Sequence, residues 1–444
     1  MDREHVGQGH KGIVQFARAV RQFISGDAFQ ATMLLLLVLI SLGLSSVVWM
    51  GSSFPLIRPE RAQGLSAPGN HRETDWRELL VPRSATVHLS SRDHFLLRCN
   101  DPQLAHLWSG GSLIEVLSAL KAGAQQDVKP EAVQFDSPGV TIEFAMPWQY
   151  GGMEVESLTI AGGKNPNAIL KMAEEPGRWV RFPLKSLPVP VDTLLREFDP
   201  KTAARAVELP TSYGQAALEK GIFVPVEDVE FIHYAGDYDL QGNEALATFF
   251  MDSAMLRRVM ERDGAVIFTD GQRGLRLYPS GEIEFTWPQG EETQASLDRQ
   301  KALEEAGKFV SQHGGFPVES RVKSVREAGE GYHVEIDYFV DGYPVLRRGG
   351  SAIQLDVDRS GVKRYFRGVR KASRVVDTLQ DELSWKDALA IAVRSQAPDG
   401  KAVTVVRRIY RCYIDEGSLR PAWAVETYRG IIVVDSVSGQ VTLL

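Results

Sequence analysis

The most chemically suggestive pair of side chains in the sequence is Asp270 and Arg273, in the segment FTDGQR. A carboxylate beside a guanidinium can bind a ligand or a protein partner. An Asp-Gly pair, however, is first of all a signal for a tight turn, because Gly271 can adopt positive φ at no steric cost. The sequence therefore predicts a turn at Asp270, with a contact to a ligand or partner as the alternative.

Histidines and paired carboxylates are the other groups that could perform chemistry. The histidines after position 50 show no H-E-x-x-H motif, no i, i+4 pair and no cysteine partner, so they indicate neither a metal centre nor a nucleophilic triad. The paired carboxylates lie in polar segments typical of a solvated face, whereas acid and base catalysis needs carboxyl groups in one cleft. These pairs are Glu174 with Glu175, Glu291 with Glu292, and Glu304 with Glu305. We assign no catalytic, cofactor-binding or metal-binding residue and expect a protein that is not an enzyme.

Two further pairs follow from spacing alone. His88 and His94 flank the turn of a predicted hairpin and are expected to face one another as a polar cross-strand pair. Cys99 and Cys412 are the only cysteines and lie more than three hundred positions apart, which is not a disulfide framework. Two separate buried thiols are expected, with one long-range disulfide as the alternative.

The element that must position the whole chain is a predicted transmembrane helix at residues 31–50. No charged residue occurs between Asp27 and Arg58, and twenty residues at about 1.5 Å rise each cross a bilayer core of about 30 Å. A cleavable signal peptide is the alternative, but its apolar region is usually shorter. Positive charges are more numerous in the leader, residues 1–30, than in the segment that follows the helix. The expected protein is therefore single-pass, with its N-terminus in the cytoplasm and its C-terminal domains outside.

Small residues mark one face of this predicted helix. Ser41 and Ser45 form a small-xxx-small pair, and Gly43 lies between them. Small side chains let two helices approach closely in lipid, so this face is a candidate for packing against a partner helix.

Composition excludes one class of partner. The net charge of −7 consists of +1 for residues 1–27 and −8 for the remainder. A weakly acidic outer part without a basic block argues against nucleic-acid binding. The 394 residues after position 50 exceed the usual limit of about 250 to 300 for one hydrophobic core, so two or three domains are expected.

The predicted organisation is α+β. After a linker at 51–75, an N-terminal α+β domain at 76–205 precedes a middle α+β domain at 206–290, in which 245–261 reads as a helix. Residues 291–444 contain a helix followed by an antiparallel meander, twice, at about 291–375 and 376–444. The expected outer part is thus built of antiparallel sheets with packed helices.

Four segments resemble the YycH family and its sister family YycI. They are VPRSATVHLSSRDHFLL (81–97), VIFTDGQRGLRLYPSGEIEF (266–285), DGYPVLRRGGSAIQLDVDRSGVKRY (341–365) and LRPAWAVETYRGIIVVDSVSGQV (419–441). The order of elements matches over nearly the whole outer part, and the last segment also resembles PepSY-like modules. By this resemblance, residues 291–444 form a YycI-like domain.

The resemblance implies an accessory regulator of the essential WalK/WalR system, also called YycG/YycF, which controls cell-wall metabolism in Gram-positive bacteria. The implied partners are a WalK/YycG-like sensor histidine kinase and a YycI-like membrane protein. The contacts would involve membrane helices and outer domains. No cofactor and no small-molecule substrate are implied.

Two other functions stay open from the sequence. PepSY-like modules often accompany proteases, so a protease, a wall hydrolase or a propeptide-like protease inhibitor is one alternative. An enzyme of this kind would gather polar residues in one pocket, whereas an inhibitor would bind a protease without such a pocket. A structural scaffold of an envelope complex is the other alternative, and it would leave kinase output unchanged.

Overall fold

The computed structural model describes residues 79–444 apart from short gaps. These gaps fall at 110–119, 121–124, 136–137, 151, 164, 174, 176, 185–189, 228–230, 241–243, 252–255, 289–295, 318, 380–381 and 397–403. All the described residues belong to one compact unit, Ala67–Leu444. The predicted leader, transmembrane helix and linker lie outside them. No helix in the described ranges is both long and apolar enough to cross a membrane.

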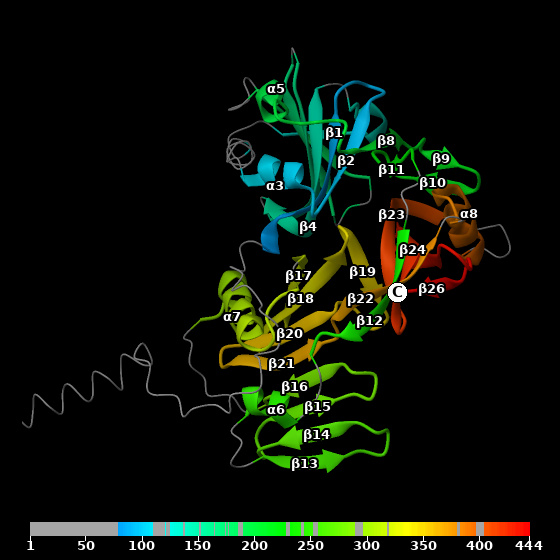
Figure 1. The fold of residues 1–444 in the computed structure, drawn as a ribbon. Helices are drawn as coiled ribbons and strands as arrows, with labels where there is room; N and C mark the ends of the chain where they lie inside the picture. Colours follow the sequence, from blue (N-terminus) through cyan, green and yellow to red (C-terminus); the bar gives the residue numbers. More distant parts are fainter. Residues whose placement is uncertain are drawn as a thin grey trace, which may run out of the picture. The chain divides into compact units, whose positions relative to one another are not determined.

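The first sheet has nine strands and lies at the top of Figure 1. In spatial order they are β11 (Phe223–Pro225), β8 (Ala204–Glu208), β2 (His94–Arg98), β1 (Pro82–His88), β4 (Gly139–Tyr150), β5 (Met153–Ala161), β6 (Asn167–Met172), β7 (Trp179–Pro183) and β3 (Gln126–Val128). Helices α3 (Pro102–Ser109) and α5 (Val191–Leu194) and the short 3₁₀ helix η2 (Pro130–Ala132) accompany it. Leu104 and Leu107 of α3 join Val87, Leu158 and Ile160 in one buried core, so one face of the sheet is covered by helices.

The second sheet has eight strands, and all its pairings are antiparallel. They are β13 (Arg257–Met260), β14 (Val266–Thr269), β15 (Gly274–Leu277), β16 (Ile283–Thr286), β21 (Gly361–Arg367), β20 (Ile353–Asp358), β18 (Gly331–Val340) and β17 (Ser320–Ala328). Helix α7 (Arg299–Gln312) packs on this sheet, with buried residues Ala302, Leu303, Ala306 and Val310. Their spacing of three to four residues is that of an amphipathic helix. The Asp298 side chain caps the helix by accepting a hydrogen bond from the backbone N–H of Lys301 (2.8 Å). Helix α6 (Glu244–Phe250) contributes Phe250 to the same core.

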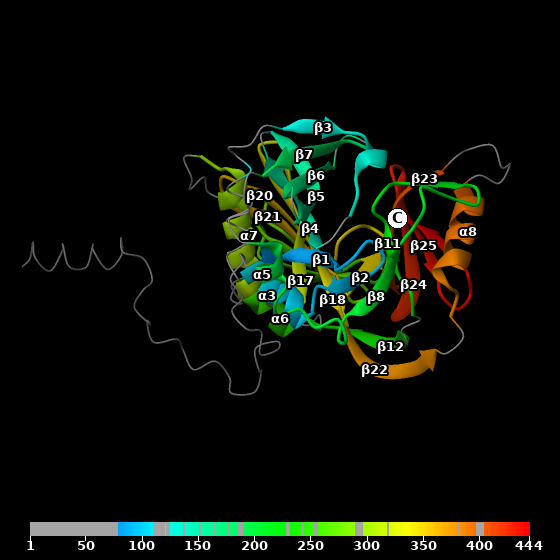
Figure 2. The ribbon, with the colours of Figure 1, turned by 90° about the horizontal axis from the view of Figure 1, so that it is seen from above.

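The third sheet is organised around the long strand β23 (Thr404–Asp415). Its other members are β24 (Ser418–Thr427), β25 (Gly430–Asp435), β26 (Val441–Leu443), β9 (Ser212–Tyr213), β10 (Ala216–Leu218), β19 (Tyr343–Arg347), β12 (Phe231–Tyr238) and β22 (Arg370–Leu379). β10 and β19 both pair with β23 in parallel. Helix α8 (Trp385–Gln396) covers the side of this sheet that faces away from the first sheet (Figure 2). The third sheet therefore lies between a helix and the first sheet.

Most predicted elements are present. The hairpin of β1 and β2, the strands β14 to β16, and the two helices α7 and α8, each followed by antiparallel strands, are confirmed. The prediction of one helix at 245–261 is wrong, because α6 ends at Phe250 and β13 pairs with β14. All four side chains of β13 are exposed. The strand therefore lacks the alternation of buried apolar and exposed polar residues from which a strand is predicted. Strands β21 and β22 were not predicted.

Strands inside the predicted middle domain are shared among the three sheets. β8 and β11 join the first sheet, β10 joins the third, and β13 to β16 extend the second. The boundaries of the predicted domains remain predictions. The observed architecture is mostly antiparallel sheet with few helices.

A buried ion pair ties the end of β12 to the second sheet. The guanidinium of Arg367 donates hydrogen bonds to Asp239 and to the carbonyl of Gly315 (2.7 Å). The two side chains of the pair are 1% and 3% exposed. Removal of the carboxylate leaves an unpaired guanidinium in the interior.

We expect Asp239→Ala to lower the free energy of unfolding by about 3–5 kcal/mol. Urea denaturation of the full-length protein measures this. Asp127→Ala breaks the exposed pair with Arg178 and serves as the control, which should change little. A similar loss in both variants would contradict the assigned role of burial.

Candidate functional site

A cavity of about 140 Å³ lies between the first sheet and β23. Apolar side chains line part of it, including Phe135, Trp179, Phe223, Phe339 and Ile409. Its charged lining consists of Arg83, Arg98, Lys171, Arg407, Arg408, Arg411, Glu143 and Glu156. Residues more than two hundred positions apart in the sequence thus form one charged site.

Glu156 is the centre of this site. Its residue is 5% exposed, and Arg407 Nη2 donates a hydrogen bond to its Oε2 (2.7 Å). Arg408 Nε and Lys171 Nζ lie 3.3 Å and 3.7 Å from its Oε1. Burial by itself raises the pKa of this carboxyl, but attraction by Arg408, Lys171 and Arg407 outweighs burial and lowers the pKa to about 2. Glu156 is therefore ionised at neutral pH.

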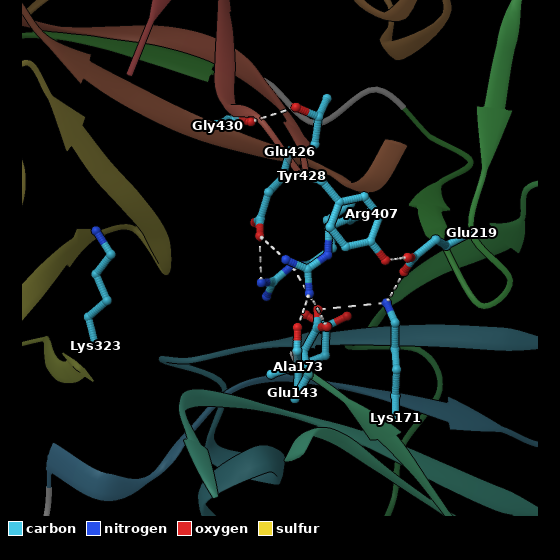
Figure 3. Close-up of polar contacts among 12 residues, drawn as sticks. Glu143, Lys171, Ala173, Glu219, Lys323, Arg407, Glu426, Tyr428 and Gly430 are labelled. Atoms are coloured by element: carbon cyan, nitrogen blue, oxygen red, sulfur yellow. Dashed lines mark hydrogen bonds and ion pairs between the residues drawn. The ribbon is translucent and has the colours of Figure 1, made fainter. Parts of the chain in front are cut away.

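Two more carboxylates extend the network from both sides (Figure 3). Glu426, on β24, accepts a hydrogen bond from Arg408 Nη2 (2.9 Å). Glu219, which follows β10, lies 2.7 Å from Lys171 Nζ and accepts a hydrogen bond from the Tyr428 hydroxyl. The network therefore connects the first sheet to the strands of the third.

A β-bulge on β23 aims two consecutive arginines at the first sheet. Side chains alternate between the two faces of a regular strand, yet Arg407 and Arg408 both pair with Glu156. The register of β23 against β24 shifts between Val406 and Arg408. Val406 and Ile409, three residues apart, both join the core beside α8. The bulge thus places one extra residue on the charged face.

A second bulge faces the first one. The register of β5 against β6 shifts between Val155 and Ser157, at Glu156 itself. Val155 and Leu158 both belong to the core of the first sheet, while Glu156 and Ser157 both line the cavity. The principal ion pair of the site therefore joins two bulged positions. Bulges are common where a functional side chain has to be re-aimed.

Several donors of the site have no hydrogen-bond acceptor among the described residues. They are Nε of Arg407 and both Nε and Nη1 of Arg408, all buried. Arg408 Nε faces Glu156 as an ion pair, but not in hydrogen-bonding geometry.

A buried histidine pair adjoins the cavity. His88 Nδ1 lies 2.9 Å from His94 Nδ1, and His88 Nε2 lies 2.8 Å from Thr141 Oγ1. The rings of Phe135 and Phe223 pack on His88, each at 5.2 Å between centroids. Burial, with the charge of His94 as a smaller cause, lowers the pKa of His88 to about 3. The predicted cross-strand pair is confirmed.

A similar fold occurs among solved structures. YycH from Bacillus subtilis matches with a TM-score of 0.52 at 11% identity, over 82% of this chain and 98% of that chain. The chain has a YycH-like fold. An uncharacterised protein from Eubacterium rectale matches with a TM-score of 0.35 at 12% identity, over 54% of this chain and 93% of that chain. The Bacillus megaterium YpeB C-terminal domain matches with a TM-score of 0.27 at 12% identity, over 46% of this chain and 98% of that one. No family model and no curated protein matches the sequence.

This YycH-like fold places Asp270 and Arg273 in the turn between β14 and β15. Asp270 Oδ1 accepts hydrogen bonds from the backbone N–H groups of Gln272 (3.0 Å) and Arg273 (2.7 Å). Arg273 Nε donates to Asp270 Oδ2 (2.7 Å), and Gly271 has φ +95°. The predicted turn is confirmed, and a contact to a partner stays a prediction. The turn is not part of the cavity.

The remaining predicted residues divide into two groups. Ser41, Gly43 and Ser45 lie outside the described residues. Cys99 and Cys412 are buried free thiols, as expected. In the part of the chain that the structure describes, no group of three His, Cys, Asp or Glu side chains is placed to hold a metal ion.

Arg407 and Arg408 were not predicted from the sequence as residues of a site. The segment VTVVRRIYRCY (403–413) is predicted to be a strand because it is rich in β-branched and aromatic residues. The doublet within it was the available signal, because two adjacent charges cannot both lie on the solvent face of a regular strand.

We expect Glu156→Gln to lower the free energy of unfolding at pH 7 by about 3 kcal/mol, since the folded state lowers the pKa of this carboxyl to about 2. Chemical denaturation of the full-length protein measures the loss. Glu154→Gln, at a half-buried position on the same strand, is the matched control. Equal stability of the two variants would show that the network contributes no net stabilisation.

Acid should destabilise the protein through His88. Below pH 6.5 an unfolded chain binds a proton at this position, whereas the folded chain does not until about pH 3. His88 therefore does not reduce the free energy of unfolding above pH 6.5, and its uptake of a proton in the unfolded chain lowers that free energy by about 2 kcal/mol by pH 5. We expect His88→Gln to flatten the dependence of unfolding free energy on pH between 6.5 and 5. His106→Gln, at an exposed position of α3, should leave that slope unchanged, and the assignment to His88 fails if both variants behave alike.

Proposed function

We propose that this protein is a membrane-anchored, extracytoplasmic accessory regulator of a WalK/YycG-like sensor histidine kinase. The supporting observation is the YycH-like fold, which spans 82% of this chain and 98% of the solved YycH chain. The four YycH-like segments found in the sequence agree with it. In this proposal a YycI-like membrane protein is the second partner, and the regulated process is cell-wall metabolism.

The protein acts by binding rather than by catalysis in this proposal. Glu156 pairs with Lys171, Arg407 and Arg408, and its carboxyl stays ionised at neutral pH. A carboxyl in that state does not serve as a proton donor near pH 7. Regulation needs a binding free energy that differs between the two states of the kinase, typically by about 1–3 kcal/mol.

The charged network is suited to transmitting such a difference. Glu156 on the first sheet and Arg407 on the third are joined by a 2.7 Å hydrogen bond. A displacement of one sheet against the other would leave buried charges without partners, which is strongly unfavourable. A partner that displaces one sheet would therefore also change the stability of the position of the other sheet.

The test is a crosslinking pull-down of the full-length protein from membranes, followed by kinase detection. We expect the native protein to recover a sensor kinase and Ser41→Leu with Ser45→Leu to recover less, because larger side chains prevent close helix approach. Val38→Leu is the matched control and should retain recovery. A second version replaces residues 31–50 with an unrelated membrane helix, and a loss of recovery there places the contact in the bilayer.

The remaining outcomes separate the alternatives. Recovery of the kinase by all versions would place the contact in the outer domains and would exclude a role for Ser41 and Ser45. If the native protein recovers no kinase, the proposal fails. Recovery of a protease would then favour the inhibitor. Recovery of a kinase whose output is unchanged by deletion of the protein would favour the scaffold.

A further inference from the structure

One edge of the second sheet is uncovered. Its first strand, β13, pairs with β14 and with no other described strand, whereas β17 at the opposite edge packs against β4 of the first sheet. All four side chains of β13 are exposed, Val259 by 51% and Met260 by 68%. Figure 1 shows β13 at the end of the second sheet that is farthest from the first sheet. An uncovered edge strand can accept an additional strand.

The backbone of β13 directs hydrogen-bonding groups outward. The N–H of Glu261 donates to the carbonyl of Ala265 (2.8 Å) in the turn to β14. Because the direction of these groups alternates along a strand, the N–H and C=O of Met260 and of Arg258 point away from β14. The register of β13 on β14 is regular, whereas β22 has two register shifts against β12. Bulges protect an edge from strand addition, and β13 lacks that protection.

This edge carries positive charge without counterions. Arg257 and Arg258 of β13 and Arg262 in the turn after it are exposed, and none of them has an ion pair among the described residues. The two carboxylates of the same turn both bind Arg276 of β15, at 2.6 Å and 2.7 Å. Three unmatched arginines therefore lie beside a free strand edge, in a chain whose net charge is −7.

The charge of the edge indicates the class of partner. Pairing with β13 of a second copy would bring two arginines from each chain together without a carboxylate, which is unfavourable. An added strand with acidic residues opposite Arg257 and Arg258 gains cross-strand attraction instead. Apolar residues opposite Val259 and Met260 would cover exposed apolar surface. In antiparallel addition such a strand has the order apolar, apolar, acidic, acidic from its N-terminus.

We propose that the free edge of β13 binds an extended acidic segment of a protein partner by strand addition. The backbone groups of Arg258 and Met260 bond to the added strand, and two adjacent carboxylates of that strand lie opposite Arg257 and Arg258. The proposal assigns a surface and the chemistry of its partner, and it holds whether or not that partner is a kinase.

The test is fluorescence anisotropy of the labelled peptide TVVEET, titrated with the full-length protein in detergent micelles at low ionic strength. We expect saturable binding at one site per chain. The matched peptide TVVKKT should bind at least tenfold more weakly, because its lysines meet the arginines of the edge. Equal binding of the two peptides, or no saturable binding of TVVEET, would overturn the proposal.

Two pairs of variants locate the site. Arg257→Gln with Arg258→Gln should weaken binding of TVVEET at least tenfold. Arg92→Gln with Arg196→Gln removes two exposed arginines elsewhere and should leave binding within twofold. Met260→Pro keeps every charge but removes an outward N–H, so it should bind at least tenfold more weakly than Met260→Thr, which keeps that N–H. Proline at such an edge position leaves the pairing with β14 intact, and thermal unfolding close to that of the native protein checks this.

The variants and one added lipid also separate the other occupants. Equal binding by Met260→Pro and Met260→Thr would exclude strand addition. Phosphatidylglycerol in the micelles should leave the dissociation constant of TVVEET within twofold, and displacement of the peptide by this lipid would assign the arginines to an anionic membrane surface. A dimer in sedimentation equilibrium that Met260→Pro abolishes would assign the edge to a second copy, and the proposal would then be wrong.

Discussion

One buried carboxylate, that of Glu156, joins the first sheet to the third. Glu156 is withdrawn from water and is surrounded by two guanidinium groups and an ammonium group. A buried charge is tolerated only with partners that are close and well oriented. The strands that supply these partners, β6 and β23, are therefore constrained in position relative to β5.

That constraint accounts for the two bulges. In regular strands, Arg407 and Arg408 would point to opposite faces, and one of them would enter the core beside α8. The bulge on β23 prevents this, and the bulge on β5 gives Glu156 its position opposite them. Apolar residues on either side of each bulge keep their places in the cores. Local irregularity of the backbone thus satisfies charge pairing and apolar burial at the same time.

The resulting molecule combines rigid sheets with a polar contact between them. The apolar cores extend across the sheets, since Val224 of β11 joins the core beside α8 and Tyr413 of β23 joins the core beside α7, and the cavity and its ion pairs lie where the first sheet meets β23. This YycH-like fold thus has a buried polar site where the first sheet meets β23.

The sequence by itself determined the local elements and the broad class. Turn residues and period-two patterns predicted the hairpin of β1 and β2 and strands β14 to β16, and apolar periodicity predicted α7 and α8, because these signals arise within a few neighbouring residues. The turn at Asp270 and the resemblance to YycH were also readable. Only the tertiary structure decided that β13 is a strand, that the strands of 206–290 are shared among three sheets, and that Arg407 and Arg408 meet Glu156. These features depend on pairing between segments up to 251 residues apart, and a local pattern holds no information on which distant strand supplies the partner.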